Sequence, residues 1–258
     1  MEIKIIVILF LIIILAQSIE TTTGFGATVI ALSLGALVFP LKQLVPILVM
    51  IGIIQSGFIV LWRFRYIQWR ILLARIMIFS GLGLPLGIWF YRHFPSERLK
   101  IFLGIFIILV SGYELYNLLI KKSISKPLSL ISSILLLASG GFIHGVFATG
   151  GPLIVYYAGR EIKNKAQFRA TLSLLWLVLN FILLISYLLS ATINQDNLKM
   201  TGLLLPALVL GIVLGEILHR KVQEQTFRVV VQIILFFTGV SILADSFPWI
   251  SIWAKFLK

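Results

Sequence analysis

The chain is organised around the stretch Gly140-Gly-Phe-Ile-His-Gly-Val-Phe-Ala-Thr-Gly-Gly-Pro152 and a shorter partner near the N-terminus, Glu20-Thr-Thr-Thr-Gly-Phe-Gly-Ala27. Both stretches lie within apolar sequence that is long enough to be embedded in a membrane, yet both are rich in residues that break or loosen a helix. In lipid, backbone polar groups stay unpaired only where protein or a water-filled cavity satisfies them. Two such interruptions at matching places in two halves of a chain are a sequence signature of a transporter's substrate site.

The composition around these stretches is that of a membrane protein. Of the 258 residues, 60% are hydrophobic and 12% are charged, and the mean hydropathy is +1.08. Charged residues are about half as frequent as in an average soluble domain. Apolar runs recur along the whole length, and each is long enough to cross a hydrocarbon core of about 30 Å. The sequence therefore predicts an all-α polytopic membrane protein of the cell (cytoplasmic) membrane.

The formal net charge of +13 does not indicate a nucleic-acid partner. The basic residues lie in short loops between apolar segments, as expected of cytoplasmic loops, and no stretch forms a soluble basic domain. The chain has no cysteine, which excludes disulfides, thiolate metal sites and cysteine nucleophiles. We expect no metal site, no cofactor and no catalytic residue.

The apolar segments form two sets of five. The first set falls at about 4–20, 25–40, 44–62, 71–91 and 99–120, and the second at about 128–147, 151–159, 167–190, 200–219 and 227–246. The segment before Arg160 is too short to span a membrane alone. Whether the first two segments of each set are full spans or half-helices stays open, so we expect eight to ten membrane segments.

The two sets match in sequence as well as in number. At an offset of 125 residues, Gly26 falls on Gly151 and Gln55 falls on Asn180, and with a slip of two or three residues Gly83–Gly87 falls on Gly211–Gly215. We interpret the chain as a duplication. The predicted parts are a first transmembrane repeat at 1–120, a cytoplasmic linker at 121–127, and a second repeat at 128–258 that ends in a short amphipathic tail. Met1–Ala16 resembles a signal peptide, but its counterpart in the second set favours a retained segment.

The distribution of lysine and arginine predicts the orientation. If the first two segments together return the chain to its starting side, four loops share one face and carry 14 of the 22 basic residues. These are Arg63, Arg65, Arg70, Arg75, Lys121, Lys122, Lys126, Arg160, Lys163, Lys165, Arg169, Arg220, Lys221 and Arg228. The positive-inside bias places this face in the cytoplasm, and the two repeats are then inverted relative to one another.

The glycine turns predict a site for an anion. A chain that turns through Gly24 and Gly26, or through Gly150 and Gly151, starts a new helix within the membrane, and the first N–H groups of a helix are unpaired and partly positive. Two such ends that meet near the bilayer midplane bind an anion without a buried cation, which would cost about 2.5 kcal/mol or more. Pro152 suits the first turn of the second helix. The alternative, that glycines only permit close packing, is preferred for Gly35, Gly104 and Gly239.

Several side chains are candidates for the same site. Thr23, Thr28 and Thr149 offer hydroxyl donors, and His144 is able to bind substrate or carry a proton, although it is also consistent with a packing role. Gln55 and Asn180 lie near the middles of matching segments, where an unpaired amide is costly. They either bond to neighbouring helices or donate to a bound oxyanion. Glu20 is a functional candidate because it is ionisable at membrane depth.

Two of these stretches resemble a known family. Gly140–Pro152, followed by Phe168-Arg-Ala-Thr-Leu172, resembles the second signature of the TauE/SafE family of membrane proteins, often called sulfite exporters, and Thr23-Gly-Phe-Gly-Ala-Thr28 resembles the first. The chain departs from the family at Ala27 and Thr28, where more glycines are usual, and at Pro152, where many members have a third glycine. The resemblance implies a cytoplasmic-membrane transporter that moves sulfite, organosulfonates or related sulfur anions outward.

Two other classes of function are weighed against a carrier. An anion channel is compatible with inverted repeats, whereas an intramembrane enzyme needs a nucleophile–base pair, a metal cluster or paired acids, and no motif of that kind is found. The expected partners are a small anionic substrate, the lipid bilayer and a coupling ion, H⁺ or Na⁺. The sequence fixes neither this ion nor the oligomeric state.

Overall fold

The structure is a computed structural model that describes residues 3–23, 26–119, 128–219 and 224–246, although the side chains of residues 22–23, 218–219 and 224–228 are not described. The described chain is helical throughout. Its elements are α1 (Ile3–Thr23), α2 (Ala27–Gly35), α3 (Leu41–Arg63), a 3₁₀ turn (Phe64–Tyr66), α4 (Trp69–Ile71), a π-helical turn (Leu72–Ile76), α5 (Met77–His93), α6 (Ser96–Leu119), α7 (Leu130–Phe147), α8 (Gly151–Glu161), α9 (Lys165–Leu189), α10 (Gln195–His219) and α11 (Glu224–Ser246).

Eight helical segments of the described chain are long and apolar enough to cross a membrane. Helix α2 has 9 residues and α8 has 11, so they extend about 14 and 17 Å and reach only about halfway through a hydrocarbon core. The open choice between full spans and half-helices is thereby settled for these two segments. The chain is an all-α, multi-pass membrane protein with eight long and two short helices among its described residues.

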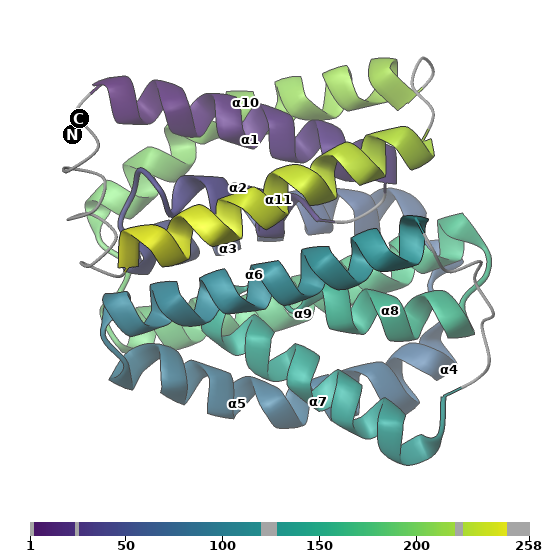
Figure 1. Cartoon of the computed structure of the whole chain (residues 1–258). Helices are drawn as coiled ribbons and strands as arrows, with labels where there is room; N and C mark the ends of the chain where they lie inside the picture. Colours follow the sequence, from purple (N-terminus) through teal and green to yellow (C-terminus); the bar gives the residue numbers. More distant parts are fainter. Residues whose placement is uncertain (1–2, 24–25, 120–127, 220–223, 247–258) are drawn as a thin grey trace.

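Each short helix doubles back on the long helix before it. In Figure 1, α1 runs from the left of the view to the right, and α2 returns to the left, where α3 begins. In the second half, α7 runs leftward and α8 returns to the right, where α9 begins. Helix α1 begins and α11 ends at the left of Figure 1, and α3, α6, α8 and α10 all end at the right, as expected if each interrupted pair returns the chain to its starting side.

The long helices pack in pairs that repeat between the halves. Helix α1 packs along α10, α5 along α7, α3 along α9, and α6 along α11. If α1 corresponds to α7 and α5 to α10, the first two pairs are equivalent, and the other two each join corresponding helices. This pattern supports the duplication, which remains a prediction together with the repeat boundaries.

Glycines allow the two equivalent pairs to pack closely. A Cβ on Gly83 or Gly87 of α5 would overlap backbone atoms of α7, and a Cβ on Gly211 or Gly215 of α10 would come within 2.8 Å of backbone oxygens of α1. Small residues at helix crossings are how membrane helices gain packing contacts when no hydrophobic driving force acts between them. Gly35, Gly104 and Gly239 also face close neighbours, which confirms the packing role predicted for them.

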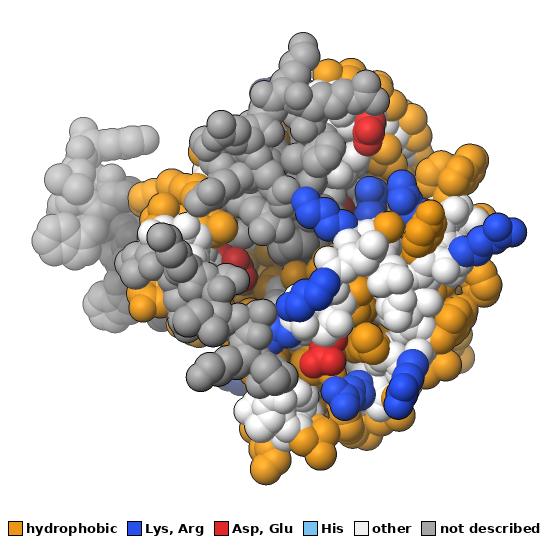
Figure 2. Space-filling view, turned by 90° about the vertical axis from the view of Figure 1, so that its right-hand side faces the viewer, with side chains coloured by type: hydrophobic (Ala, Val, Ile, Leu, Met, Phe, Trp, Pro, Cys, Tyr) orange, Lys and Arg blue, Asp and Glu red, His pale blue; other side chains and the backbone are white. Residues whose placement is uncertain are grey.

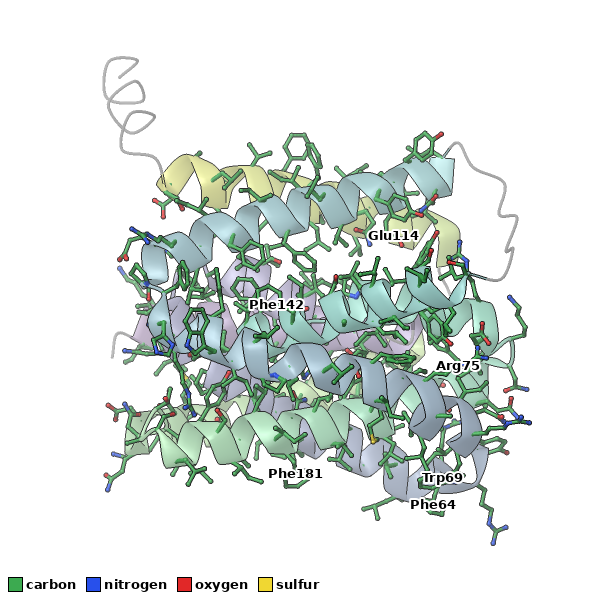
Figure 3. All side chains as sticks on the ribbon, turned by 90° about the horizontal axis from the view of Figure 1, so that it is seen from below. Phe64, Trp69, Arg75, Glu114, Phe142 and Phe181 are labelled. Atoms are coloured by element: carbon green, nitrogen blue, oxygen red, sulfur yellow. The ribbon has the colours of Figure 1, made fainter. Side chains whose placement is uncertain are left out.

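The exterior suits a bilayer. Large apolar side chains point outward along the helices. Lysine and arginine gather on the face of the molecule that lies at the right of Figure 1 (Figure 2). Phe64 and Trp69 stack edge to face at 5.4 Å at this end, near Arg75 (Figure 3). Aromatic rings next to basic residues are typical of the membrane–water interface.

Candidate functional site

The two short helices begin at one cavity in the interior of the bundle. Its volume is about 40 Å³, enough for a few waters or one small anion. Seven of the ten residues predicted for the site line it: Gly26, Thr28, Gln55, His144, Thr149, Gly151 and Asn180. The other described lining residues are Glu20, Val29, Gly52, Ser56, Ala148 and Trp176. Segments far apart in the sequence therefore meet here.

Three predicted residues have a different status. Gly24 and the side chain of Thr23 lie outside the described residues. Gly150 is described but does not line the cavity, and a Cβ on it would overlap the carbonyl oxygen of Gly140 in α7. Because Gly150 has no Cβ, the start of α8 packs closely against α7.

Helix α2 starts at a glycine in the left-handed region. Gly26 is its N-cap, with φ of 108° and ψ of −5°, a conformation that residues with a Cβ rarely adopt. Gly26 has no side chain that could accept from the first N–H groups of the helix, and the carboxylate of Glu20 accepts instead. Its Oε2 accepts a hydrogen bond from the backbone N–H of Ala27 at 2.8 Å. The partial positive charge at the start of α2 therefore already has an anion of the protein beside it.

Helix α8 starts after a different turn, and its N-cap, Gly150, has a negative φ of −64°. Ala148 ends α7 in the left-handed region, with φ of 55°, and its N–H donates to the carbonyl of His144 at 2.7 Å. Gly151 then opens α8, with Pro152 in the first turn as predicted. A Cβ on Gly151 would meet nothing within 4 Å among the described atoms, because this residue borders the cavity.

The predicted amides approach the cavity from two helices that cross beside it. On α3, Nε2 of Gln55 donates to Oε1 of Glu20 at 2.8 Å. On α9, Oδ1 of Asn180 lies 3.1 Å from Nε2 of His144. Gly52 of α3 leaves room for the Asn180 amide, since a Cβ there would lie 2.8 Å from Nδ2. Of the two alternatives for these amides, the structure shows bonds between helices: Gln55 of α3 is bonded to Glu20 of α1, and Asn180 of α9 to His144 of α7.

Two buried polar side chains face the cavity without a partner. Among the described residues, Nδ1 of His144 and the hydroxyl of Thr149 have none, although these side chains are only 2% and 3% exposed. His144 is held in place by stacking on Trp176, with ring centroids 5.4 Å apart. A buried polar atom left unpaired costs roughly 1–3 kcal/mol. Both atoms are therefore suited to a ligand or to water.

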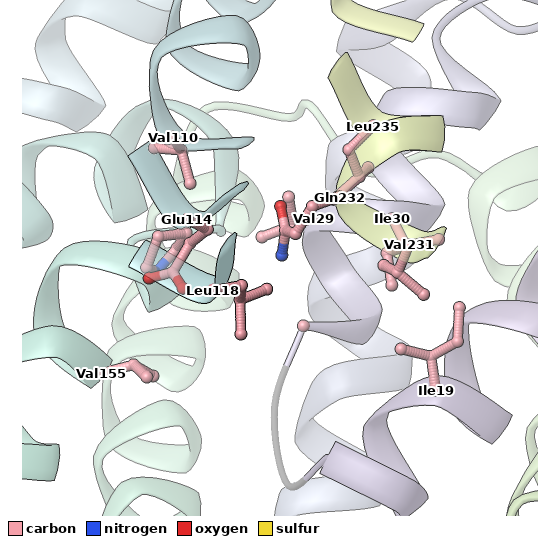
Figure 4. A pocket seen from close by; sticks show the side chains of 12 residues that line it. Ile19, Val29, Ile30, Val110, Glu114, Leu118, Val155, Val231, Gln232 and Leu235 are labelled. Carbon is pink, nitrogen blue, oxygen red and sulfur yellow. The ribbon is translucent and has the colours of Figure 1, made fainter. Parts of the chain in front are cut away.

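Two further cavities adjoin this site. One, of about 300 Å³, is lined by Gln55, Phe58, Ile59, Trp62, Arg63, Arg169 and Ile212. Because Gln55 borders both, its amide forms part of the wall between the site and this basic vestibule. The other, of about 60 Å³, is also bordered by Gly26, and its lining includes Glu114 of α6 and Gln232 of α11 (Figure 4).

Sequence reasoning missed two features of the site. Glu20 was recognisable as an acid at membrane depth, but its bonds to Ala27 and Gln55 depend on a chain reversal that no local pattern encodes. Trp176 carries no signal in the sequence, because one aromatic residue in an apolar helix is ordinary. In the part of the chain that the structure describes, no three histidine, aspartate or glutamate side chains come together as a metal site would require.

Comparison with known proteins gives the site a context. A sequence profile of the family described as "Sulfite exporter TauE/SafE" matches residues 9–242. The "Probable inner membrane transporter protein TsaS" of Comamonas testosteroni is 24% identical over 180 residues, which are 69% of this chain and 74% of that protein. No solved structure matches the chain.

Proposed function

The chain belongs to the TauE/SafE family of membrane transporters, and from this premise we propose that it carries small sulfur-containing anions, such as sulfite or organosulfonates, out of the cell. The substrate binds between the two halves, in the cavity at which α2 and α8 begin. The binding roles of the predicted site residues and the outward direction of transport are part of this proposal.

The observation that carries the proposal is the chemistry of the cavity at the start of α8. The unpartnered hydroxyl of Thr149, the backbone of Gly151 at the start of α8 and the amide of Asn180 border a space that fits one small anion. Hydrogen bonds to a charged group contribute about 1.5–3 kcal/mol each. Donors of this kind bind an anion in the membrane without the cost of a buried permanent cation.

A sulfonate or sulfite group suits these donors because it presents several acceptor oxygens in a compact shape. The three kinds of donor come from different elements: Thr149 precedes α8, Gly151 opens it, and Asn180 projects from α9. Each oxygen of the anion is then able to face a different donor. The basic vestibule at Arg63 and Arg169 leads toward this cavity and raises the local concentration of anions.

The proposal is tested by uptake into inverted membrane vesicles, in which export from the cell becomes uptake. Labelled sulfite, thiosulfate, sulfoacetate and sulfate are each supplied with and without a proton gradient. We expect saturable uptake, with competition among those anions that are carried. Flux that does not saturate would indicate a channel, and no uptake of any of them into vesicles shown to contain folded protein would contradict the proposed substrate class.

A further inference from the structure

The cavity holds one acidic side chain among its described lining residues, Glu20, and its position suggests more than a structural role. Its two carboxylate oxygens have separate partners: Oε2 accepts from Ala27 at the start of α2, and Oε1 accepts from Gln55 of α3. Glu20 itself is partly exposed where it borders the cavity. One of the two helix ends is therefore occupied by an anion that belongs to the protein.

The second helix end has no such group. At the 125-residue offset, the counterpart of Glu20 is Gly145. A Cβ on Gly145 would overlap the backbone of α5 at Leu84 and Gly87. Of the two helix starts, only that of α8 thus faces the cavity without a carboxylate among the described residues. An external anion that binds there must share a cavity of about 40 Å³ with Glu20.

The charge on Glu20 decides how well an anion binds beside it. Two negative charges on the order of 6 Å apart, at an effective dielectric constant of about 20, repel each other enough to weaken binding by roughly 100-fold. A proton on Glu20 removes this repulsion. It also weakens the hold of the carboxylate on the N–H of Ala27, which leaves the start of α2 free to attract the incoming anion.

Among the ionisable groups near the cavity, Glu20 is the acid whose proton binding should change when an anion binds. Arg169 of α9 lines the vestibule together with Gln55, the partner of Glu20, and His144 of α7 borders the same cavity as Glu20. Helix α2 carries no ionisable residue, and α3 presents the neutral Gln55. Glu114 of α6 lies in the adjoining cavity beyond Gly26, and on α10, which packs along α1, Glu216 is exposed.

We propose that Glu20 is the proton-coupling group of this transporter: it holds the start of α2 while ionised, and it takes up one proton when a substrate anion binds at the start of α8. This inference rests on the proposed function, since it requires an anion to bind in the cavity. By linkage, a proton that strengthens anion binding is itself bound more tightly when the anion is present. Proton and anion therefore travel together, in the same direction, and the outward gradient of the anion drives export, because the proton gradient of the cell points inward.

The vestibule gives the proton a route to Glu20. Gln55 borders both the site and the vestibule, and the basic face lies beyond Arg63. When Glu20 is protonated, it is no longer a charged acceptor for Gln55, so its hydrogen bond to the amide in the wall between the two cavities weakens.

The test measures protons directly. Purified full-length protein in lightly buffered detergent solution is titrated with thiosulfate and with sulfoacetate, whose ionisation does not change near neutral pH, while an indicator dye reports proton uptake. We expect about one proton taken up per anion bound, and an apparent Kd that falls about tenfold for each unit of pH lowered, the limiting slope for one linked proton. In Glu20→Gln, binding persists, proton uptake is lost and the pH dependence disappears.

Two control variants separate Glu20 from the other ionisable groups. Glu114→Gln removes an acid from the adjoining cavity and should keep both proton uptake and the pH dependence. His144→Asn removes the other titratable group in the site and should keep proton uptake, although anion binding weakens. If Glu20→Gln still takes up a proton, or if only His144→Asn abolishes uptake, the assignment of Glu20 is overturned.

A flux assay distinguishes a failure of this inference from a failure of the proposed function. Vesicles loaded with unlabelled anion exchange it for labelled anion without net proton movement. Glu20→Gln should still exchange the anion but lose accumulation driven by an imposed proton gradient that is acid outside the vesicles. Accumulation retained in Glu20→Gln would overturn the coupling role alone, whereas no binding or exchange of any probe by the wild type would overturn the proposed function and the inference with it.

Discussion

The two short helices of this protein begin at the same cavity but differ in what meets their first N–H groups. At α2, the carboxylate of Glu20 accepts from Ala27 and fills the place of an anion. At α8, the hydroxyl of Thr149 and the ring of His144 leave polar atoms without a partner among the described residues. The two ends therefore differ: the start of α2 binds an acidic side chain of the protein, whereas the start of α8 lies beside unpartnered polar atoms, and it is there that we propose the ligand binds.

The two turns also use glycine for different reasons. Gly26 is required by its backbone, because φ of 108° excludes most side chains, although there is space around it. Gly151 has no such backbone constraint and is required only by the space it leaves in the cavity. The comparison therefore separates conformational need from room for a ligand, and variants at the two positions should fail in different ways.

The largest effect is expected from Gly151→Val. A Cβ on Gly151 meets no described atom within 4 Å, so the protein should fold and insert, but the side chain occupies the cavity and the anion loses its bonds to Thr149 and the first turn of α8. Two hydrogen bonds to a charged ligand, at about 1.5–3 kcal/mol each, correspond to a loss of at least about 100-fold in transport. The measurement is initial uptake rate per folded protein in vesicles.

Gly202→Val is the matched control for this variant, since a Cβ on Gly202 of α10 also meets nothing within 4 Å. It should transport normally. Normal flux in Gly151→Val would remove α8 from the site and would break the comparison between the two helix ends.

A smaller loss is expected from Thr149→Val, which replaces a hydroxyl by a methyl group of similar size. One hydrogen bond to the anion is lost, which should raise KM by roughly 10-fold or more. Stability should stay unchanged or rise slightly, because the buried hydroxyl has no partner in the described chain. Thr201→Val, which removes a buried hydroxyl bonded to the carbonyl of Asn197, serves as the control and should leave KM unchanged.

Gly26→Ala sharpens the comparison at the other turn. An alanine at φ of 108° is strained by about 1–2 kcal/mol, so we expect a lower thermal unfolding temperature in detergent. Gly151→Ala and Gly81→Ala place a methyl group in open space without that strain and should leave the unfolding temperature nearly unchanged. Equal destabilisation at all three positions would contradict the distinction between conformation and space.

The smallest effect is expected at the start of α9, the helix that carries Asn180, compared with the start of α3, the helix that carries Gln55. Asn164 caps α9, with its Oδ1 accepting from Ala166 at 2.9 Å and from Gln167 at 3.1 Å, whereas α3 starts after Pro40 without a side-chain cap. Asn164→Ala should cost about 1 kcal/mol of stability and leave KM unchanged. Hydrogen exchange at the start of α9, compared with the start of α3, reports this change, and unaltered protection in the variant would show that the cap contributes nothing.

The main features of the fold could be read from the sequence, because the physics of a bilayer acts on composition. Runs such as 44–62 and 167–190 have to be helical spans, and the structure places α3 and α9 there. The glycine clusters at Gly26 and Gly151 mark the starts of the short helices because only a break in the helix explains them. Seven of the ten residues predicted from these breaks, from their neighbours and from two amides at matching positions line the cavity, and their role in binding stays a prediction.

The remaining features of the site depend on contacts between distant segments. Glu20 reaches Ala27 only because α2 folds back beside α1, and His144 meets Asn180 across two helices. The sequence suggested equal roles for Gln55 and Asn180, since it shows their matching positions but not their partners. It also could not separate Gly150, which packs on Gly140, from Gly151, which borders the cavity.

The most direct test of the central claim is a structure of the full-length protein with selenite, an analogue of sulfite whose selenium is located by anomalous scattering. We expect one strong selenium position in the cavity, with its oxygens within hydrogen-bond distance of the Thr149 hydroxyl and the N–H of Gly151. Selenium found only in the vestibule beside Arg63 and Arg169, or a cavity that stays empty at saturating selenite, would contradict the account.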